Sequence, residues 1–151
     1  MKFSKLSQLS LAAAAGLVVA TLLSACSLVT IDYVFVGGQF SDSSGTLKGG
    51  IQVFASDSES GALRPVAGTD KTPFDAGGLR PVALAVTPDF ANLYVANADN
   101  NTVAHLAIDN SGKLTLKDKI TLAAPPVAVS VNPSGKALYV VSGTTTAVLQ
   151  S

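Results

Sequence analysis

Several residue types that usually carry chemistry are scarce in this 151-residue chain. It has no tryptophan, one cysteine and one histidine, so neither a disulfide framework nor a multi-ligand metal centre is expected. The Gly-x-Gly-x-x-Gly and Walker patterns are absent, and no serine lies in a nucleophile elbow. Charged residues form 13% of the chain and sum to zero, without the clustered basic face that nucleic-acid binding requires. We therefore expect no metal, no cofactor and no nucleic-acid partner, and any catalytic residues are unknown.

The N-terminus has the organisation of an export signal. Lys2 and Lys5 precede an apolar run that ends in Leu-Ser-Ala-Cys, with the cysteine at Cys26. A charged start, an apolar stretch and small residues before a cut are the parts of a secretory signal. The alternative, a membrane-spanning helix, needs about 20 apolar residues, and this run is shorter and interrupted. Leu-Ser-Ala-Cys resembles the bacterial lipoprotein signal, in which the cysteine thiol is acylated and cleavage leaves that cysteine as the first residue of the mature protein. We predict a signal peptide at residues 1–25, lipid attachment at Cys26, and an anchor with a short linker at residues 26–31.

The lipoprotein signal implies a cellular location. Ser27 follows the cysteine, and the absence of aspartate there resembles the outer-membrane sorting pattern of Gram-negative bacteria. Removal of Lys2 and Lys5 with the signal leaves eight basic residues against ten acidic ones. We expect an exported, weakly acidic protein that contacts the membrane through its lipid and faces the periplasm.

The chain beyond the signal contains an internal repeat of 45 residues. Pro-Val-Ala-Leu-Ala-Val-Thr-Pro begins at Pro81, Pro-Val-Ala-Val-Ser-Val-Asn-Pro begins at Pro126, and Leu-Tyr-Val follows each, with the tyrosines at Tyr94 and Tyr139. A looser early copy begins at Tyr33, which the pattern aligns with Tyr94. Its additional residues fall in stretches rich in Gly, Ser, Asp or Pro, as expected of loop insertions. The recurring tyrosines indicate scaffold packing.

Each repeat predicts four short strands. In the middle copy these are residues 82–86, 93–96, 103–108, and 113–116 leading to 120–122. The first is an apolar run bounded by prolines, typical of a strand covered on both faces. No helical period of useful length follows the signal. Four antiparallel strands in 40–50 residues is the spacing of a propeller blade. The sequence therefore predicts an all-β fold, a β-propeller of four-stranded antiparallel blades, of which residues 32–151 hold about two to three.

These motifs resemble the seven-bladed lactonase-family propellers. The resemblance rests on Tyr-Val-x-Asn at Tyr94, on the Ile-x-Val-Phe-x-x-Asp-x-x-x-Gly-x-Leu stretch from Ile51, and on the two Pro-Val-Ala copies. That family is similar to bacterial phosphogluconolactonases and includes lipid-anchored envelope proteins. The resemblance implies an envelope lipoprotein that acts as a binding or scaffold module for a protein or a carbohydrate-derived ligand. It leaves open a lactone hydrolase similar to 6-phosphogluconolactonase, and a truncated product without function is a third reading.

The repeat number differs from that of the family. A complete member needs about seven repeats, whereas this chain supplies two and the beginning of a third. Large exposed apolar faces mark partner surfaces or promote association. We therefore favour the N-terminal part of a longer protein over a complete two-blade domain, with the missing blades or self-association covering the open faces.

Few side chains are candidates for a site. His105 aligns with an apolar position of the preceding repeat, which favours packing over general-base chemistry. Asp57 and Asp109 each precede a glycine without the spacing of an EF-hand loop, so we interpret them as turn caps. Arg64 and Arg80 are able to hold a carboxylate or phosphate, but each stands before a proline in a predicted loop, where solvation is expected.

Overall fold

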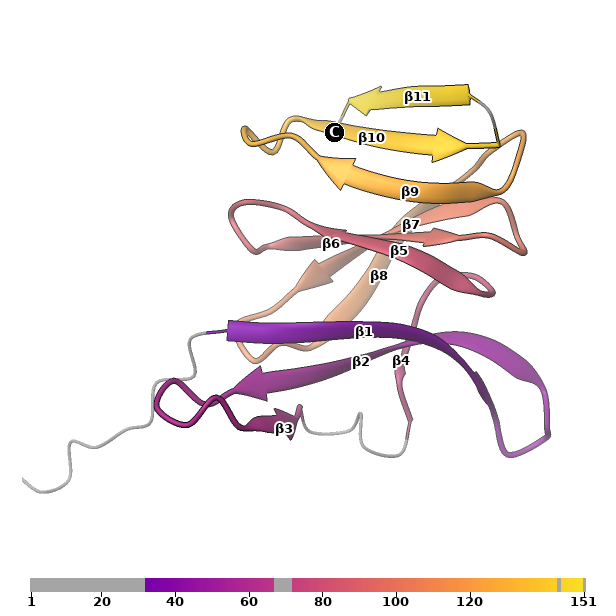
Figure 1. Cartoon of the computed structure of the whole chain (residues 1–151). Coiled ribbons are helices and arrows are strands. Elements are labelled where there is room, and N and C mark those ends of the chain that lie inside the picture. Colours follow the sequence, from indigo (N-terminus) through magenta and orange to yellow (C-terminus); the bar gives the residue numbers. More distant parts are fainter. Residues whose placement is uncertain (1–31, 67–71, 144, 151) are drawn as a thin grey trace, which may run out of the picture. The chain divides into compact units, whose positions relative to one another are not determined.

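The computed structural model describes residues 32–66, 72–143 and 145–150, with side chains described up to Gly143. These residues belong to one compact unit, Ile31–Ser151. All regular elements among the described residues are β-strands, which form three antiparallel sheets in chain order (Figure 1). The all-β prediction is therefore confirmed. The predicted signal peptide, the lipid site at Cys26 and residues 26–31 lie outside the described residues.

The middle sheet has the four strands that the repeat predicts. It contains β5 (Pro81–Val86), β6 (Asn92–Asn97), β7 (Thr102–Ile108) and β8 (Leu114–Thr121) in that spatial order. The last strand is continuous, whereas the sequence predicted two pieces. A bulge explains the difference: His105 pairs with Asp118 and Leu106 with Leu116, so β8 holds one additional residue and stays paired.

The last sheet repeats the register of the middle one. It contains β9 (Pro126–Val131), β10 (Ala137–Ser142) and β11 (Thr145–Gln150), with β10 in the centre. Tyr94 lies opposite Ala85 in the middle sheet, and Tyr139 lies opposite Ser130 in the last. Ser130 follows Ala85 by 45 residues, just as Tyr139 follows Tyr94. The predicted equivalence of the two tyrosines is therefore confirmed.

The first sheet departs from this pattern at both edges. It contains β1 (Asp32–Ser41), β2 (Leu47–Ser56), β3 (Leu63–Pro65) and β4 (Phe74–Asp75), and both short strands pair with β2. The outer strand is therefore divided in two. Arg64 lies in β3 rather than in the predicted loop. Within the described ranges no strand pairs with the free edge of β1, the place that β5 occupies beside β6.

The strand pairing corrects the early alignment by two residues. Asp57 and Asp109 begin equivalent turns, and Phe35 pairs with Val53 as Tyr94 pairs with His105. The equivalent of Tyr94 in the first sheet is therefore Phe35. Tyr33 instead matches Asn92. Because a shift of two residues keeps every side chain on its own face, the hydrophobic pattern gave no warning of the error.

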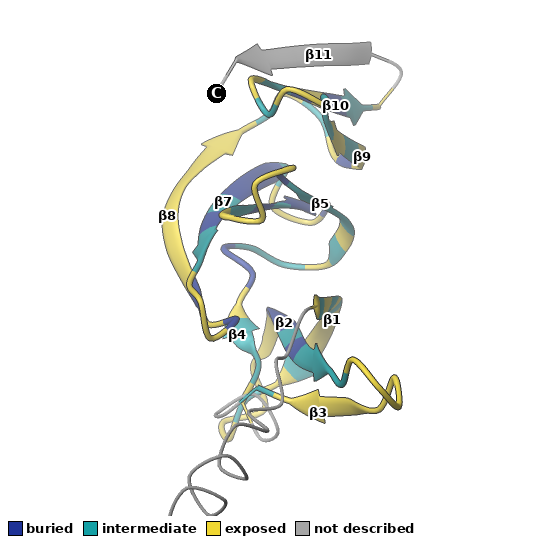
Figure 2. Ribbon diagram, turned by 90° about the vertical axis from the view of Figure 1, so that its left-hand side faces the viewer, coloured by how far each residue is buried: buried dark blue, intermediate teal, exposed yellow. Residues whose placement is uncertain are grey.

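Two apolar clusters hold the sheets together. One contains residues of β2, β6 and β7, among them Ile51, Leu93 and Leu106, and the other joins Val103 to Leu138 and Val140. Burial is concentrated between the sheets, while β8 is exposed along most of its length (Figure 2). The predicted covering of both faces holds for β5, which packs against β1 and β9 and is partly buried at every residue except Val82. It does not hold for β9, where half of the residues, Val127 among them, are exposed, because no described sheet covers the outer face of the last sheet.

Candidate functional site

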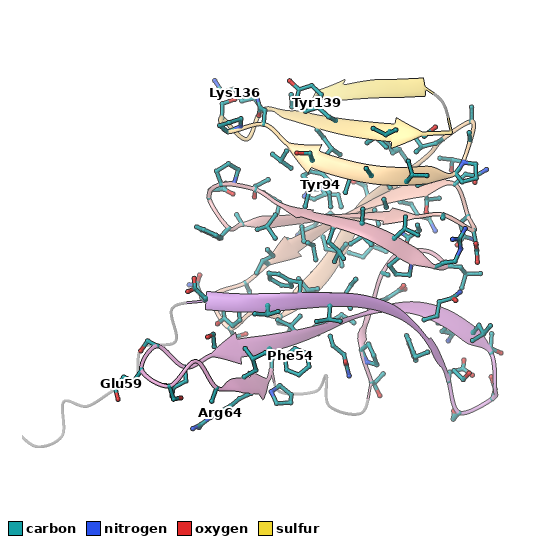
Figure 3. All side chains as sticks on the ribbon, viewed as in Figure 1. Phe54, Glu59, Arg64, Tyr94, Lys136 and Tyr139 are labelled. Carbon is teal, nitrogen blue, oxygen red and sulfur yellow. The ribbon has the colours of Figure 1, made fainter. Side chains whose placement is uncertain are left out.

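His105 lies on β7, in the space between the middle and last sheets. Its ring stacks on Tyr94, with centroids 5.0 Å apart and planes inclined by 22°. Its Nε2 lies 2.8 Å from Oδ1 of Asn92, and its Nδ1 lies 3.5 Å from a carboxylate oxygen of Asp118. Figure 3 shows Tyr94 between the middle sheet and β9. The ring is thus held by an aromatic face and a hydrogen bond, in agreement with the predicted packing contacts.

A cavity of about 540 Å³ opens beside this histidine. We call it the second niche; it lies between β6–β7 and the β9–β10 turn. The Tyr94 phenol is protonated near neutral pH and able to donate a hydrogen bond, and desolvation raises its pKa further above the ordinary value of 10.0. Hydroxyl, amide, imidazole and carboxylate groups therefore meet in one hollow, which suits a ligand rich in hydroxyl groups. Its walls are Thr87, Pro88, Asp89, Asn92, Tyr94, His105, Ser134 and Gly135.

An equivalent cavity of about 480 Å³ lies one repeat earlier, between the first and middle sheets. Phe35 takes the place of Tyr94, and Asp89 and Phe90 take the places of Ser134 and Gly135, which follow them by 45 residues. We call this cavity the first niche. Its walls are Asp32, Tyr33, Phe35, Val86, Asp89, Phe90, Ala91, Ile108, Asp109 and Asn110. The propeller repeat thus produces two related hollows with different chemistry.

Aspartates fix the turns that border these niches. The Asp109 carboxylate accepts hydrogen bonds from the Ser111 hydroxyl and from the N–H groups of Ser111 and Lys113, and the Ser111 hydroxyl is the main cause of its lowered pKa. The Thr87 hydroxyl lowers the pKa of Asp89 in the same way. Asp57 caps its own turn through Ser60 and Glu59. The predicted turn-cap role of Asp57 and Asp109 is confirmed.

The two arginines belong to neither niche. Arg64 is exposed on β3. Arg80 adopts a left-handed backbone (φ 54°) just before β5, and its Nε lies 2.5 Å from Oδ1 of Asp99. The guanidinium is therefore already engaged by a carboxylate, although half of its side chain remains exposed.

Sequence reasoning found His105 but not the residues that surround it. Asp89, which lines both niches, and Phe90, which lines the first, belong to the five-residue connection 87–91, which reads as an ordinary Pro-Asp turn, and Asn92 is the first residue of β6 after it. The signal that was available is the 45-residue offset, which places Asp89 and Phe90 over the same position as Ser134 and Gly135. In the described part of the chain, no group of three His, Cys, Asp or Glu side chains is arranged to hold a metal. No described helix is long and apolar enough to cross a membrane.

Comparison with known proteins places this architecture in a family. Residues 44–149 match the model of the lactonase seven-bladed β-propeller family. This chain belongs to the lactonase family. The match spans most of the three sheets and confirms the resemblance drawn from the repeat motifs. No curated protein matches the chain significantly.

Solved structures agree with this lactonase-type fold. A protein of unknown function from Desulfotomaculum acetoxidans is 27% identical, with a TM-score of 0.60 over 67% of this chain and 30% of its own. A Bacteroides fragilis protein provisionally assigned as a 6-phosphogluconolactonase is 21% identical, with a TM-score of 0.57 over 73% of this chain and 31% of its own. A similarly assigned Bacteroides uniformis protein is 22% identical, with a TM-score of 0.58 over 78% and 33%. The chain thus spans about a third of the length of these structures.

Proposed function

We propose that this lactonase-family chain is an envelope lipoprotein whose propeller sheets act as a binding module, and that acylated Cys26 anchors it to the outer membrane. The observation that carries the proposal is the position of the Leu-Ser-Ala-Cys26 pattern, which ends five residues before β1. An extended chain covers at most about 3.6 Å per residue, so the first sheet would start within roughly 20 Å of the lipid.

The anchor is tested by mass spectrometry of detergent-extracted protein and by membrane fractionation. We expect the wild type to carry acyl chains at Cys26 and to sediment with the outer membrane. A Cys26→Ser variant should be unacylated and should no longer sediment with the outer membrane, because it lacks the thiol that carries the acyl chains. An unmodified Cys26 in extracted wild-type protein would contradict the anchor.

The binding role is supported by the two niches. Their volumes of about 540 and 480 Å³ lie within the range of small-molecule sites. The first niche combines apolar walls with a few polar groups, whereas most residues that line the second niche are polar. A carbohydrate-derived ligand with several hydroxyl groups suits the second niche, where His105, Asn92 and Ser134 offer hydrogen bonds.

A binding module and a lactone hydrolase differ in what they do to a bound lactone. We expect the full chain to leave 6-phosphogluconolactone to its spontaneous hydrolysis, and to bind neutral oligosaccharides in a glycan screen. His105→Gln, which keeps a side-chain N–H donor, should weaken such binding only modestly, whereas His105→Ala should weaken it further. Hydrolysis above the spontaneous rate that is lost in the His105→Gln variant would favour the enzyme instead.

A further inference from the structure

The first niche combines aromatic walls with acidic rims, and we propose that it binds a small organic ammonium ion. The inference rests on the proposed binding role of the module and is independent of the lipid anchor. Three aromatic side chains contribute to the cavity: Tyr33 and Phe35 from β1, and Phe90 from the β5–β6 turn. Aromatic faces attract cations through their quadrupole, and quaternary ammonium groups are commonly recognised in this way.

Contacts between the sheets hold one aromatic wall in place. The Tyr33 hydroxyl donates a hydrogen bond to the carbonyl oxygen of Asn110 at 3.0 Å. Its ring lies so close to Gly112 that an added Cβ would approach it to 2.5 Å. Phe90, which lines the same cavity from another element, is 73% exposed. A fixed aromatic side chain together with an accessible one leaves a route into the niche.

The rim supplies charge of one sign. Asp32, Asp89 and Asp109 line the cavity, and its lining includes no lysine or arginine. The hydrogen bonds of the Asp89 and Asp109 carboxylates within their turns use Oδ1, which leaves Oδ2 of each for a ligand. A cation is therefore favoured over a neutral or anionic compound of the same shape.

The second niche serves as a comparison within the same molecule. At its turn, Ser134 and Gly135 replace Asp89 and Phe90, and its aromatic residue Tyr94 is already stacked on His105. Asp89 is the only carboxylate residue in its walls. The preference for ammonium should thus belong to the first niche alone.

The test is a saturation-transfer NMR titration of the full chain, extracted in a polyoxyethylene detergent. The probes are choline and its neutral isostere 3,3-dimethylbutan-1-ol. We expect choline to bind roughly tenfold more tightly, and the difference to shrink in 0.5 M salt because exposed charges are screened. Phe90→Ala should weaken choline binding about three- to fivefold, the size of an exposed cation–π contact.

Paired substitutions distinguish the loss of a charge in the niche from a loss of turn stability. Asp109→Asn keeps an Oδ1 acceptor for the turn but removes the charge, and should weaken choline binding about two- to threefold. Asp57→Asn makes the same change in the equivalent turn of the first sheet, outside the niche, and should leave binding unchanged. His105→Gln should also leave it unchanged. Circular dichroism verifies that each variant is folded.

Equal affinities for choline and the isostere, or equal losses in Asp57→Asn and Asp109→Asn, would overturn the proposal. So would an absence of choline binding by folded wild-type protein. These outcomes are distinct from failure of the proposed module, since acylation at Cys26 and oligosaccharide binding at the second niche are measured separately.

Discussion

The first and middle sheets have equivalent apolar faces, but only that of the middle sheet is covered by another sheet. Val34 and Val36 on β1 are 38% and 47% exposed, whereas their equivalents on β6, Leu93 and Val95, are fully buried. The difference lies in the neighbour, because Leu93 and Val95 pack against the first sheet and no described element covers Val34 and Val36. Figure 3 shows Phe54, the partner of Val34 in β2, on the side of that strand away from the middle sheet.

This contrast shows that each repeat forms a sheet with two apolar faces, both of which need a neighbouring sheet to be buried. An apolar residue at these positions contributes to stability only when another sheet covers it. The last sheet supports the same conclusion: Leu138 and Val140 are buried against the middle sheet, whereas Tyr139, on the opposite face, is 40% exposed.

The largest expected effect concerns association through the open face. A Cys26→Ser variant lacking residues 1–25 should form oligomers or aggregates, because β1 presents both exposed valines and an unpaired edge, and unpaired edges promote association. Size-exclusion chromatography with light scattering measures this directly.

Adding Val36→Lys should shift that population toward the monomer, since a charge on the face opposes docking. Lys48→Arg, which keeps an exposed charge on β2, is the matched control and should leave the association unchanged. A sharp monomer peak with cooperative unfolding in the parent variant would contradict the expectation.

The next prediction compares the loss of stability when a valine is shortened to alanine on the covered face and on the open face. Val95→Ala should lower the free energy of unfolding by about 2–3 kcal/mol, from lost burial plus a cavity. Val36→Ala removes the same atoms at the equivalent position and should cost about 1 kcal/mol or less. Urea unfolding followed by circular dichroism, at low protein concentration, gives both values. Equal losses would mean that β1 is as well covered as β6.

The fold was largely predictable from the sequence, because the 45-residue offset repeats the strand register itself. The divided outer strand of the first sheet was not predictable, since nothing in the residues around Pro65 indicates that two short strands, β3 and β4, pair with β2. The true equivalent of Tyr94 was also missed. Tyr33 matched it by residue identity, whereas the pairing of Phe35 with Val53 follows from the register of the β1–β2 hairpin, which the turn at residues 42–46 closes.

The candidate site was less predictable than the fold. Pattern analysis singled out His105 by its rarity, yet a niche between two sheets depends on which turn of the next repeat lies over which strand. That relation joins Phe35 to Phe90 across two sheets, and neither residue belongs to a recognisable motif. Local spacing describes a strand or a turn, whereas these cavities arise from the docking of neighbouring repeats.

Two equivalent glycines test that docking. Gly61 and Gly112 both have left-handed backbones, with φ of 67° and 77°, but only Gly112 has a neighbour, the Tyr33 ring. Gly61→Ala should cost about 1 kcal/mol, the penalty of a side chain in this region. Gly112→Ala should cost about 1–2 kcal/mol more, because a Cβ atom would overlap the ring. Thermal unfolding provides the comparison, and a Gly112→Ala cost equal to that of Gly61→Ala would show that the ring moves aside freely.

The smallest effect should come from the turn carboxylates, where the two sheets are alike. The pKa of Asp57 lies below its ordinary value of 3.8, chiefly through the Ser60 N–H, and that of Asp109 is lowered chiefly by the Ser111 hydroxyl. A carboxyl group with a lower pKa in the folded state stabilises that state fully above pH 4 or so, and the contribution is lost as the pH falls through the folded pKa.

The urea midpoint should therefore fall with pH below about 4. Asp57→Asn and Asp109→Asn should each flatten this decline by a similar amount, since Asn retains the acceptor without titrating. A flattening confined to Asp109→Asn would mean that docking of the sheets, and not the turn alone, holds that carboxylate in its ionised form.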